Sequence, residues 1–331
     1  MVGGRLYGQG DLPLRRLRSL ELAEADALAI CLGPKYLPAM ATTRAGAVLL
    51  PEALRDSAGP STRIVVADPA QAVAEAARLL HPRAGSVPQI DVSARIGAGT
   101  TIGESPRIGA FVVVGANVTI GHRVRIGPHV VIEDGVILGD DVRLDAGVVV
   151  HAQAFLGDRV WCQTRSVIGS EGFGFHSDAS GHRRSPQVGG CLLGDDVEVG
   201  AGSCIDRGSL DDTVIGRGTK LDNLVHVGHN ARLGEHCLVM AGTGISGSVI
   251  IGDRVILAGQ AGIAGHLAIG NDARVGAQAG VISSVPAGAS VSGYPARPHR
   301  EFLRAMAALY RLTPHVDALE ALGRAEEQDD G

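Results

Sequence analysis

An apolar residue at every sixth position is the feature that most restricts what this chain can fold into. Between Ile96 and Ile168, 13 successive positions six residues apart are all apolar: Ile96, Ile102, Ile108, Val114, Ile120, Ile126, Ile132, Leu138, Leu144, Val150, Leu156, Cys162 and Ile168. A second series starts with Leu193, Val199 and Ile205, shifts by four residues, and then runs in steps of six from Ile215 to Val281. In a chain that is 45% apolar, one register would satisfy the first series by chance about once in tens of thousands of trials. The period therefore reflects the fold.

A period of six fits neither an α-helix nor a simple strand, but it fits one side of a triangular coil. Three sides make a coil of 18 residues, and stacked coils form a left-handed parallel β-helix with a spacing of about 4.8 Å. We expect the repeated apolar residue to point inward, with a second inward position two residues earlier, as at Val118 and Val124, and the following glycine to ease a tight turn. The narrow interior explains why only 3% of the residues are aromatic. The predicted fold class is mainly β.

Residues 1–90 precede the repeat and have a different pattern. Ala-rich stretches that predict helices, Glu21–Ala29 and Ala70–Leu80, alternate with β-like stretches, Ala45–Leu50 and Arg63–Ala67. This alternation indicates a small α/β domain.

The repeat itself is expected over residues 91–297, as one β-helix domain. A polar, Gly-rich loop over 169–190 interrupts it, and a four-residue slip follows around Leu210–Thr213. Residues 298–331 are expected to form a C-terminal helical extension, because apolar residues recur there at helical spacing. Four arginines fall on one face of its first helix: Arg297, Arg300, Arg304 and Arg311. Two interpretations of them stay open, a solvated surface and a docking site for an acidic protein.

Charge and cysteine usage narrow the class of protein. The formal charge of −5 gives no reason to expect a nucleic acid partner. The five cysteines are scattered and form no CxxC pair, which suits a reducing compartment. No apolar stretch has the length of a signal peptide or of a membrane span. We therefore expect a soluble, cytoplasmic protein.

Histidines on the coil are the candidates for chemistry. Eighteen residues after His229 comes Gly247, and eighteen more lead to position 265, beside His266. These three residues should lie near one edge of the prism, with the two histidines on the order of 10 Å apart. Acyl transfer from a thioester to an amine or hydroxyl needs a base and an oxyanion donor, which His229 and the Gly247 amide can supply. The alternative is that these histidines are solvent-exposed turn residues.

A metal site has little support in the sequence. His226 and His229 are three residues apart, but side chains on a coil need not converge, and no third histidine has an obvious place. No phosphate loop, dinucleotide fingerprint or Ser/His/Asp order stands out either. We expect no metal and no cofactor.

Several segments together resemble a known enzyme family. The most specific are VIGSEGFGF at 167–175, IDRGSLDDT at 205–213, KLDN at 220–223 and VGHN at 227–230. The match extends to AGH at 264–266 and SGYPA at 292–296, and more loosely to PKY at 34–36, TRAG at 43–46 and DP at 68–69. The chain resembles, over nearly its whole length, the UDP-3-O-(3-hydroxyacyl)glucosamine N-acyltransferases of lipid A biosynthesis, which are hexapeptide-repeat acyltransferases.

The resemblance implies a cytoplasmic homotrimer with active sites in the clefts between subunits. It implies transfer of an (R)-3-hydroxyacyl chain, carried on the phosphopantetheine of acyl carrier protein, to the 2-amine of a UDP-glucosamine derivative. His229 matches the family's general base and His266 a second histidine near the reacting centre. Asp222 and Asn223 match a polar pair at the site, and Tyr36 matches an aromatic residue that packs on uracil. The arginine face would then meet the acyl carrier protein.

Three positions depart from the family pattern. The family usually has Phe six residues and Asn three residues before the matching Tyr, whereas this chain has Ile30 and Gly33. One stacking ring and one base-reading amide are therefore missing. Position 226 is His where the family commonly has Gln, which we interpret as a tolerated surface change.

The leading hypothesis is direct N-acylation, with His229 as base and the Gly247 amide as oxyanion donor. One rival is a paralogous hexapeptide acyltransferase that makes an O-acyl or N-acetyl product on another nucleotide sugar. A second rival is a trimeric scaffold that binds a nucleotide sugar without catalysis, and a third is a zinc carbonic anhydrase. The acceptor of the acyl group, the choice of donor and a metal analysis distinguish them.

Overall fold

The computed structural model describes residues 3–81, 89–294, 298–316 and 318. The chain divides into two compact units, Met1–Ser86 and Val87–Gly331. Each unit is described by itself.

The N-terminal unit is a five-stranded sheet with helices. Its strands are β1 (Arg5–Tyr7), β2 (Arg16–Arg18), β3 (Ala27–Ile30), β4 (Ala47–Pro51) and β5 (Arg63–Val66), in the order β1-β5-β4-β3-β2. All neighbouring strands are parallel except β1, which runs antiparallel to β5. The helical elements are η1 (Pro34–Tyr36), α1 (Leu37–Thr42), η2 (Glu52–Leu54) and α2 (Pro69–Leu80). Side chains of β4 alternate between two apolar clusters, so the sheet has a core on both faces.

One of the two helices predicted in this unit is confirmed. Asp68 caps α2 by accepting hydrogen bonds from the amides of Ala70 and Gln71 at 2.9 and 3.1 Å, and Pro69 starts the helix. The helix predicted over Glu21–Ala29 is wrong, because turns and then strand β3 occupy that segment. Ala29 and its neighbours are buried between β2 and β4, and burial on both faces of the sheet overrides the helix propensity of alanine.

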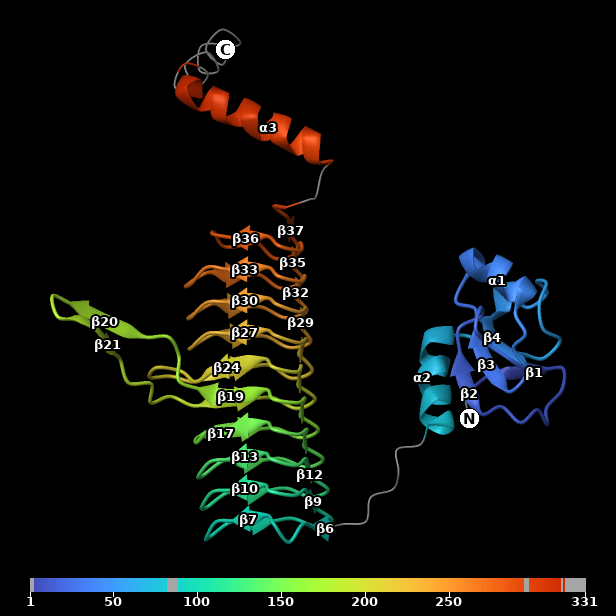
Figure 1. The fold of residues 1–331 in the computed structure, drawn as a ribbon, viewed down its shortest axis with the longest axis horizontal. Coiled ribbons are helices and arrows are strands. Elements are labelled where there is room, and N and C mark those ends of the chain that lie inside the picture. The colour runs from blue at the N-terminus through green and yellow to red at the C-terminus, as the bar shows by residue number, and fades with distance from the viewer. Residues whose placement is uncertain (1–2, 82–88, 295–297, 317, 319–331) are drawn as a thin grey trace. The chain divides into compact units, whose positions relative to one another are not determined.

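The second unit is a parallel β-helix, as predicted, with three sheets that each receive one strand per coil (Figure 1). The β7–β36 sheet contains β7 (Arg95–Ile96), β10 (Val113–Val114), β13 (Val131–Ile132), β16 (Val149–Val150), β19 (Val167–Ser170), β24 (Cys204–Asp206), β27 (His226–Val227), β30 (Gly244–Ile245), β33 (Gly262–Ile263) and β36 (Gly280–Val281). The β8–β34 sheet contains β8 (Thr101–Ile102), β11 (Thr119–Ile120), β14 (Ile137–Leu138), β17 (Ala154–Leu156), β22 (Cys191–Leu193), β25 (Thr213–Ile215), β28 (Arg232–Leu233), β31 (Ile250–Ile251) and β34 (Ala268–Ile269). The β6–β37 sheet contains β6 (Gln89–Ile90), β9 (Arg107–Ile108), β12 (Arg125–Ile126), β15 (Arg143–Leu144), β18 (Trp161–Cys162), β23 (Glu198–Val199), β26 (Lys220–Leu221), β29 (Leu238–Val239), β32 (Ile256–Leu257), β35 (Arg274–Val275) and β37 (Ser290–Val291).

The core follows the predicted period. Repeated apolar residues from Ile108 onward are buried, and so are the second inward positions such as Val118 and Val124. Ile96, in the first strand of its sheet, is still 37% exposed because no coil lies below it. Inward side chains away from the ends of the stack thus pack on equivalent residues of the coils above and below.

The glycine after each inward residue has a different role from the one predicted. A Cβ on Gly103 would lie 2.7 Å from the backbone of Gly121 in the next coil, so glycine at this position allows close approach of the coils. The left-handed backbone conformation occurs two residues later, and mostly at residues with side chains, such as Asn117 and Arg123, both with φ of 56°. The tight turn is therefore made by these residues.

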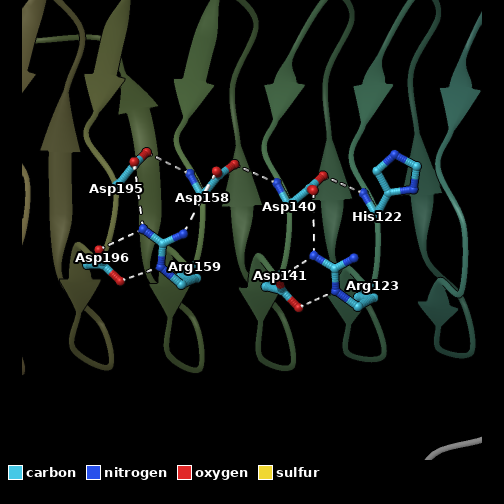
Figure 2. Close-up of polar contacts among 8 residues, drawn as sticks. All are labelled: His122, Arg123, Asp140, Asp141, Asp158, Arg159, Asp195 and Asp196. Atoms are coloured by element: carbon cyan, nitrogen blue, oxygen red, sulfur yellow. Dashed lines mark hydrogen bonds and ion pairs between the residues drawn. The ribbon is translucent and has the colours of Figure 1, made fainter.

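One corner of the β-helix carries two columns of polar side chains, shown in Figure 2. In the first column, Asp140, Asp158 and Asp195 each accept a hydrogen bond of 2.8–2.9 Å from a backbone amide of the previous coil. In the second column, Arg123 binds Asp141 and Arg159 binds Asp196 through two hydrogen bonds each, of 2.6–2.9 Å. These pairs tie successive coils together at the turn.

The segment predicted as a loop over 169–190 contains a β-hairpin. Strands β20 (Phe175–Asp178) and β21 (Gly181–Arg184) pair antiparallel and project from the stack of coils in Figure 1. The stack continues unbroken beneath it, because Ala154 of β17 pairs with Cys191 of β22. The predicted slip is also present, since Cys191 pairs in turn with Thr213.

The C-terminal extension begins with α3 (His299–Leu312), followed by η3 (Thr313–His315). None of the residues in these two elements is buried. Within the described part of the chain, no helix is both long enough and apolar enough to cross a membrane.

Candidate active site

A groove of about 600 Å³ runs along the outer surface of the β7–β36 sheet, over its last four strands. The outward-facing residues of these strands are His226, Gly244, Gly262 and Gly280, which lie in register. A Cβ added to any of the three glycines would meet no atom within 4 Å. Packing of the coils therefore does not require glycine at these three positions. The glycines keep the floor of the groove free of side chains.

His229 lies at one end of this groove, in the turn after β27. A Cβ on Gly247, one coil further on, would lie 2.7 Å from the His229 Nε2 atom. A Cβ on Gly172, in the inserted segment, would lie 2.8 Å from the His229 Cβ atom. The imidazole is thus held between two glycines, and the predicted proximity of His229 and Gly247 is present in the structure.

Asn230 determines which nitrogen of His229 carries the proton. The Asn230 Oδ1 atom accepts hydrogen bonds from the Ser209 amide at 3.0 Å and from the Ser209 hydroxyl at 2.6 Å, and its Nδ2 donates to the Asp211 carbonyl at 2.9 Å. The oxygen so oriented lies 3.0 Å from His229 Nδ1. Because it can only accept, the neutral imidazole carries its hydrogen on Nδ1 and leaves Nε2 as a proton acceptor.

The amide of Gly247 is suited to bind an oxyanion. Among the residues that the structure describes, none accepts a hydrogen bond from it, whereas the next amide, of Ser248, donates to the His229 carbonyl at 2.9 Å. A free N–H beside an unprotonated Nε2 places an oxyanion donor and a base at one point of the groove.

A second group in the groove was not identified from the sequence. Asp206, at the end of β24, is only 5% exposed, and its Oδ1 accepts a hydrogen bond of 2.9 Å from the Ser170 hydroxyl. Its Oδ2 lies 3.5 Å from His226 Nε2, and His226 lines the groove. Burial raises the pKa of Asp206, while the hydrogen bond from Ser170 and the charges of His226 and His229 lower it. His226 lies at the surface, as expected from the sequence, and its side chain also lines the candidate site.

The position of Asp206 in the sequence indicates that it could belong to the site. It lies in the IDRG segment that contributed to the family resemblance. Phe173, a residue that is 85% exposed, also borders the groove from the inserted segment. No group of three His, Cys, Asp or Glu side chains in the described ranges is arranged to hold a metal ion.

Other predicted site residues lie away from this groove in a single chain. His266 is exposed and occupies the left-handed turn position after Gly265, with φ of 61°, and it does not line the groove. Asp222 and Asn223 lie at a different corner, after β26, where their carboxylate and amide oxygens accept hydrogen bonds from the amides of Ala241 and Ala201 at 3.2 and 2.7 Å. Within one chain they bridge successive coils.

The remaining predicted residues belong to the N-terminal unit and the C-terminal extension. Tyr36 ends η1 and packs partly against an apolar cluster, with the Lys35 ammonium 4.8 Å from the centre of its ring. Arg300, Arg304 and Arg311 are exposed on α3. Arg297 lies outside the described residues.

Comparison with known proteins confirms the resemblance inferred from the motifs. Residues 11–79 match a family model described as UDP-3-O-(3-hydroxymyristoyl) glucosamine N-acyltransferase, LpxD. Residues 99–134, 212–247 and 230–265 match the model of the bacterial transferase hexapeptide. The β-helix unit therefore contains the predicted hexapeptide repeats.

The chain is also similar to curated proteins named UDP-3-O-acylglucosamine N-acyltransferase. It is 56% identical to the one from Agrobacterium fabrum over 162 residues, which cover 49% of this chain and 42% of that protein. It is 40% identical to the one from a Methylobacterium species over 164 residues, which cover 50% of this chain and 45% of that protein. The matched region spans about half the length of these relatives. The crystal structure of Francisella novicida UDP-N-acetylglucosamine acyltransferase covers 66% of this chain and 73% of its own, with a TM-score of 0.48 and 23% identity.

Proposed function

We propose that this protein transfers an (R)-3-hydroxyacyl chain from acyl carrier protein to the 2-amine of a UDP-3-O-(3-hydroxyacyl)glucosamine, as a step of lipid A biosynthesis in the cytoplasm. The observation that carries the proposal is the contact of His229 with Gly247 at the end of a groove floored by glycines. The similarity to named N-acyltransferases in both the N-terminal unit and the β-helix supports the choice of substrate.

The reaction is direct acyl transfer without an acyl-enzyme or a metal. The amine attacks the thioester carbon while His229 Nε2 takes a proton from the amine nitrogen, and the Gly247 amide donates a hydrogen bond to the oxyanion. Asn230 supports this step because it keeps the His229 proton on Nδ1. The acyl donor arrives on the phosphopantetheine of the carrier protein, so no further cofactor takes part.

The glycine floor suits an acyl chain. Three in-register glycines leave an open strip beside the base, and the exposed Ile282 contributes an apolar side chain to its lining. An extended hydrocarbon chain laid along such a strip buries apolar surface without displacing any side chain.

A homotrimer is supported by the distribution of side chains on the three outer faces. The β8–β34 sheet presents an in-register apolar row of Ile137, Phe155, Leu192 and Val214. The lower part of the β7–β36 sheet presents Val113, Val131, Val149 and Val167. The β6–β37 sheet instead presents charged residues such as Arg107, Arg125, Glu198 and Lys220. Two apolar faces and one charged face suit three chains packed around an axis, with the third face in solvent.

In such a trimer, Asp222 and Asn223 of one subunit border the His229 groove of a neighbour, and His266 meets substrate there. Tyr36 packs on the uracil ring, and the missing partners at Ile30 and Gly33 leave it as the main aromatic contact. Arg300, Arg304 and Arg311 bind the acidic carrier protein through exposed guanidinium groups, and Arg297 adds a further positive charge from the sequence.

The test is mass spectrometry of the product formed by the purified protein from a panel of hydroxyacyl carrier-protein donors and the UDP-sugar acceptor. We expect an amide at the 2-position, and His229→Ala should lower turnover by roughly 10³-fold without changing the oligomeric state. An ester product, or a preference for coenzyme A thioesters, would instead favour a paralogous acyltransferase. Binding of the UDP-sugar without transfer would favour a scaffold.

A further inference from the structure

His226 and Asp206 form a pair inside the groove that the proposed reaction does not use. His226 Nε2 lies 3.5 Å from Asp206 Oδ2, and the side chain of His226 is half exposed, whereas that of Asp206 is 7% exposed. The other carboxylate oxygen is occupied by the Ser170 hydroxyl at 2.9 Å. One end of the pair is thus fixed inside the protein, and the imidazole stands at the groove surface.

The buried carboxylate has no permanent cation beside it. In the described part of the chain, no lysine or arginine forms an ion pair with Asp206, and the groups whose charge acts on it are His226 and His229. A buried carboxylate without a fixed cation either takes up a proton or keeps a proton on its neighbour. Burial raises the pKa of Asp206, which fits a carboxyl group that shares a proton with an imidazole.

His226 and His229, the two histidines that line the groove, have different neighbours at their ring nitrogens. His229 is held at Nδ1 by an amide oxygen, which leaves Nε2 as an acceptor toward Gly247. His226 instead has a carboxylate oxygen 3.5 Å from its Nε2, which can hold the ring in place when it is protonated. On one neighbouring strand, Cys204 lies in register with His226, and burial raises the pKa of the Cys204 thiol. On the other neighbouring strand, the residue in register is Gly244, which carries no side chain. Among the described residues, Asp206, His229 and Cys204 are thus the titratable groups that bear on His226.

We propose that His226, supported by Asp206, is the general acid that protonates the leaving thiolate. This inference rests on the proposed function. When the tetrahedral intermediate collapses, the carbon–sulfur bond breaks and its electron pair goes to sulfur. The imidazolium of His226 gives the proton from the ring nitrogen not held by Asp206, so the carrier leaves as a thiol. His229 then holds the proton taken from the amine, and exchange with water returns each histidine to its starting state, so no other reactant is needed.

The decisive measurement is the dependence of rate on the leaving thiol. Small-molecule donors with the same hydroxyacyl group are compared, one a thioester of N-acetylcysteamine and the other a thioester of thiophenol, whose thiolate leaves without help from an acid. His226→Gln keeps the size and hydrogen bonding of the side chain but cannot ionise. We expect this variant to lose about 100-fold in kcat with the alkyl thioester and less than about fivefold with the aryl thioester.

Two further variants complete the experiment. Asp206→Asn should reproduce the difference between the two donors, because the buried amide keeps the shape of the carboxylate and removes its charge. His236→Gln is the matched control, since this exposed histidine lies outside the groove and should leave both rates unchanged.

The outcomes separate the inference from the proposed function. An equal loss with both donors would mean that His226 only shapes the groove, and no loss with either donor would mean that it has no part in the reaction. Either result, with an active wild-type protein, overturns the inference alone. A wild-type protein that acylates no amine with any donor overturns the proposed function and this inference together.

Discussion

At the scale of single residues, the position and the proton of His229 are set by neighbours from three different segments. Gly172 of the inserted segment and Gly247 of the next coil enclose the ring, and Asn230 binds Nδ1. Each of these contacts can be altered by one substitution at a residue outside the hydrophobic core.

Gly247→Ala tests the closeness of this arrangement. The added Cβ would lie 2.7 Å from His229 Nε2, so the imidazole has to move away from the oxyanion donor. We expect turnover to fall by about 100-fold, because a displacement of about 1 Å at a catalytic group has that effect. Steady-state kinetics measures the loss, and an unchanged thermal midpoint shows that the β-helix is intact. Turnover within a factor of two of the wild type would contradict this view of the site.

Asn230→Ala tests the control of the His229 tautomer. Without the amide oxygen at 3.0 Å, the proton is free to move to Nε2, where it blocks base catalysis. We expect turnover to fall by about 10- to 100-fold. Asn230→Asp keeps an acceptor beside Nδ1 and should recover part of the loss. NMR of the imidazole nitrogens can assign the tautomer directly, and an unchanged tautomer in the alanine variant would contradict the prediction.

At the scale of elements, the coils are joined at one corner by carboxylates that accept backbone hydrogen bonds and by Arg–Asp pairs that span two coils. Hydrogen bonds from Arg123 and Arg159 hold the pKa of Asp141 and Asp196 below the ordinary value. A carboxyl group with a lowered folded-state pKa stabilises the fold above its unfolded-state value, near 3.8, and loses that contribution as the pH falls through the folded-state value.

Asp196→Asn should therefore make the β-helix less sensitive to acid. In the wild type, we expect the thermal midpoint to fall as the pH goes from 6 to below about 4, because Asp196 and its equivalents take up protons. In the variant, the midpoint at pH 6 should be slightly lower and the decrease toward acid smaller. Circular dichroism melts at both pH values measure this difference. Parallel curves for the two proteins would show that the pair adds nothing to stability, as is common for exposed ion pairs.

At the scale of the whole molecule, the outer faces of the β-helix differ in kind. Phe155 is 41% exposed and Ile137 is 44% exposed within an in-register apolar row, whereas the β6–β37 sheet carries arginines at the equivalent positions. A row of exposed apolar side chains on a regular sheet favours association with other copies of the chain.

Phe155→Glu should break the proposed trimer. A carboxylate on the apolar row has to be buried without a partner if subunits associate there, which is unfavourable by several kcal/mol, in the range of about 3–5. We expect light scattering to show monomers that keep their β-helix, together with a loss of activity, since Asp222 and Asn223 would no longer reach a neighbouring groove. Arg107→Glu, a charge change on the polar face, is the control and should leave the trimer intact. A trimer of the Phe155 variant would place the interface elsewhere.

The fold of the β-helix and the closeness of His229 to Gly247 could be predicted because both follow from a repeat in the amino-acid sequence. One inward residue in six determined the parallel β-helix, since each side of the coil must bury an apolar residue against the same side of the next coil. The same regularity placed Gly247 beside His229, because 18 residues return the chain to the same side. The amino-acid sequence by itself therefore determined the fold and the central contact of the site.

Only the tertiary structure decided the features that depend on breaks in that regularity. The slip near residue 210 lengthens one coil, so Cys204 pairs with His226 and not with a residue 18 positions on, and this brings Asp206 to His226. The insertion returns Gly172 to His229 across a segment whose path no period describes. Burial on both faces of a sheet turned the Ala-rich segment before Ile30 into a strand. In each case, contacts between distant segments outweighed the local pattern, because packing free energy depends on which surfaces meet and not on their spacing along the chain.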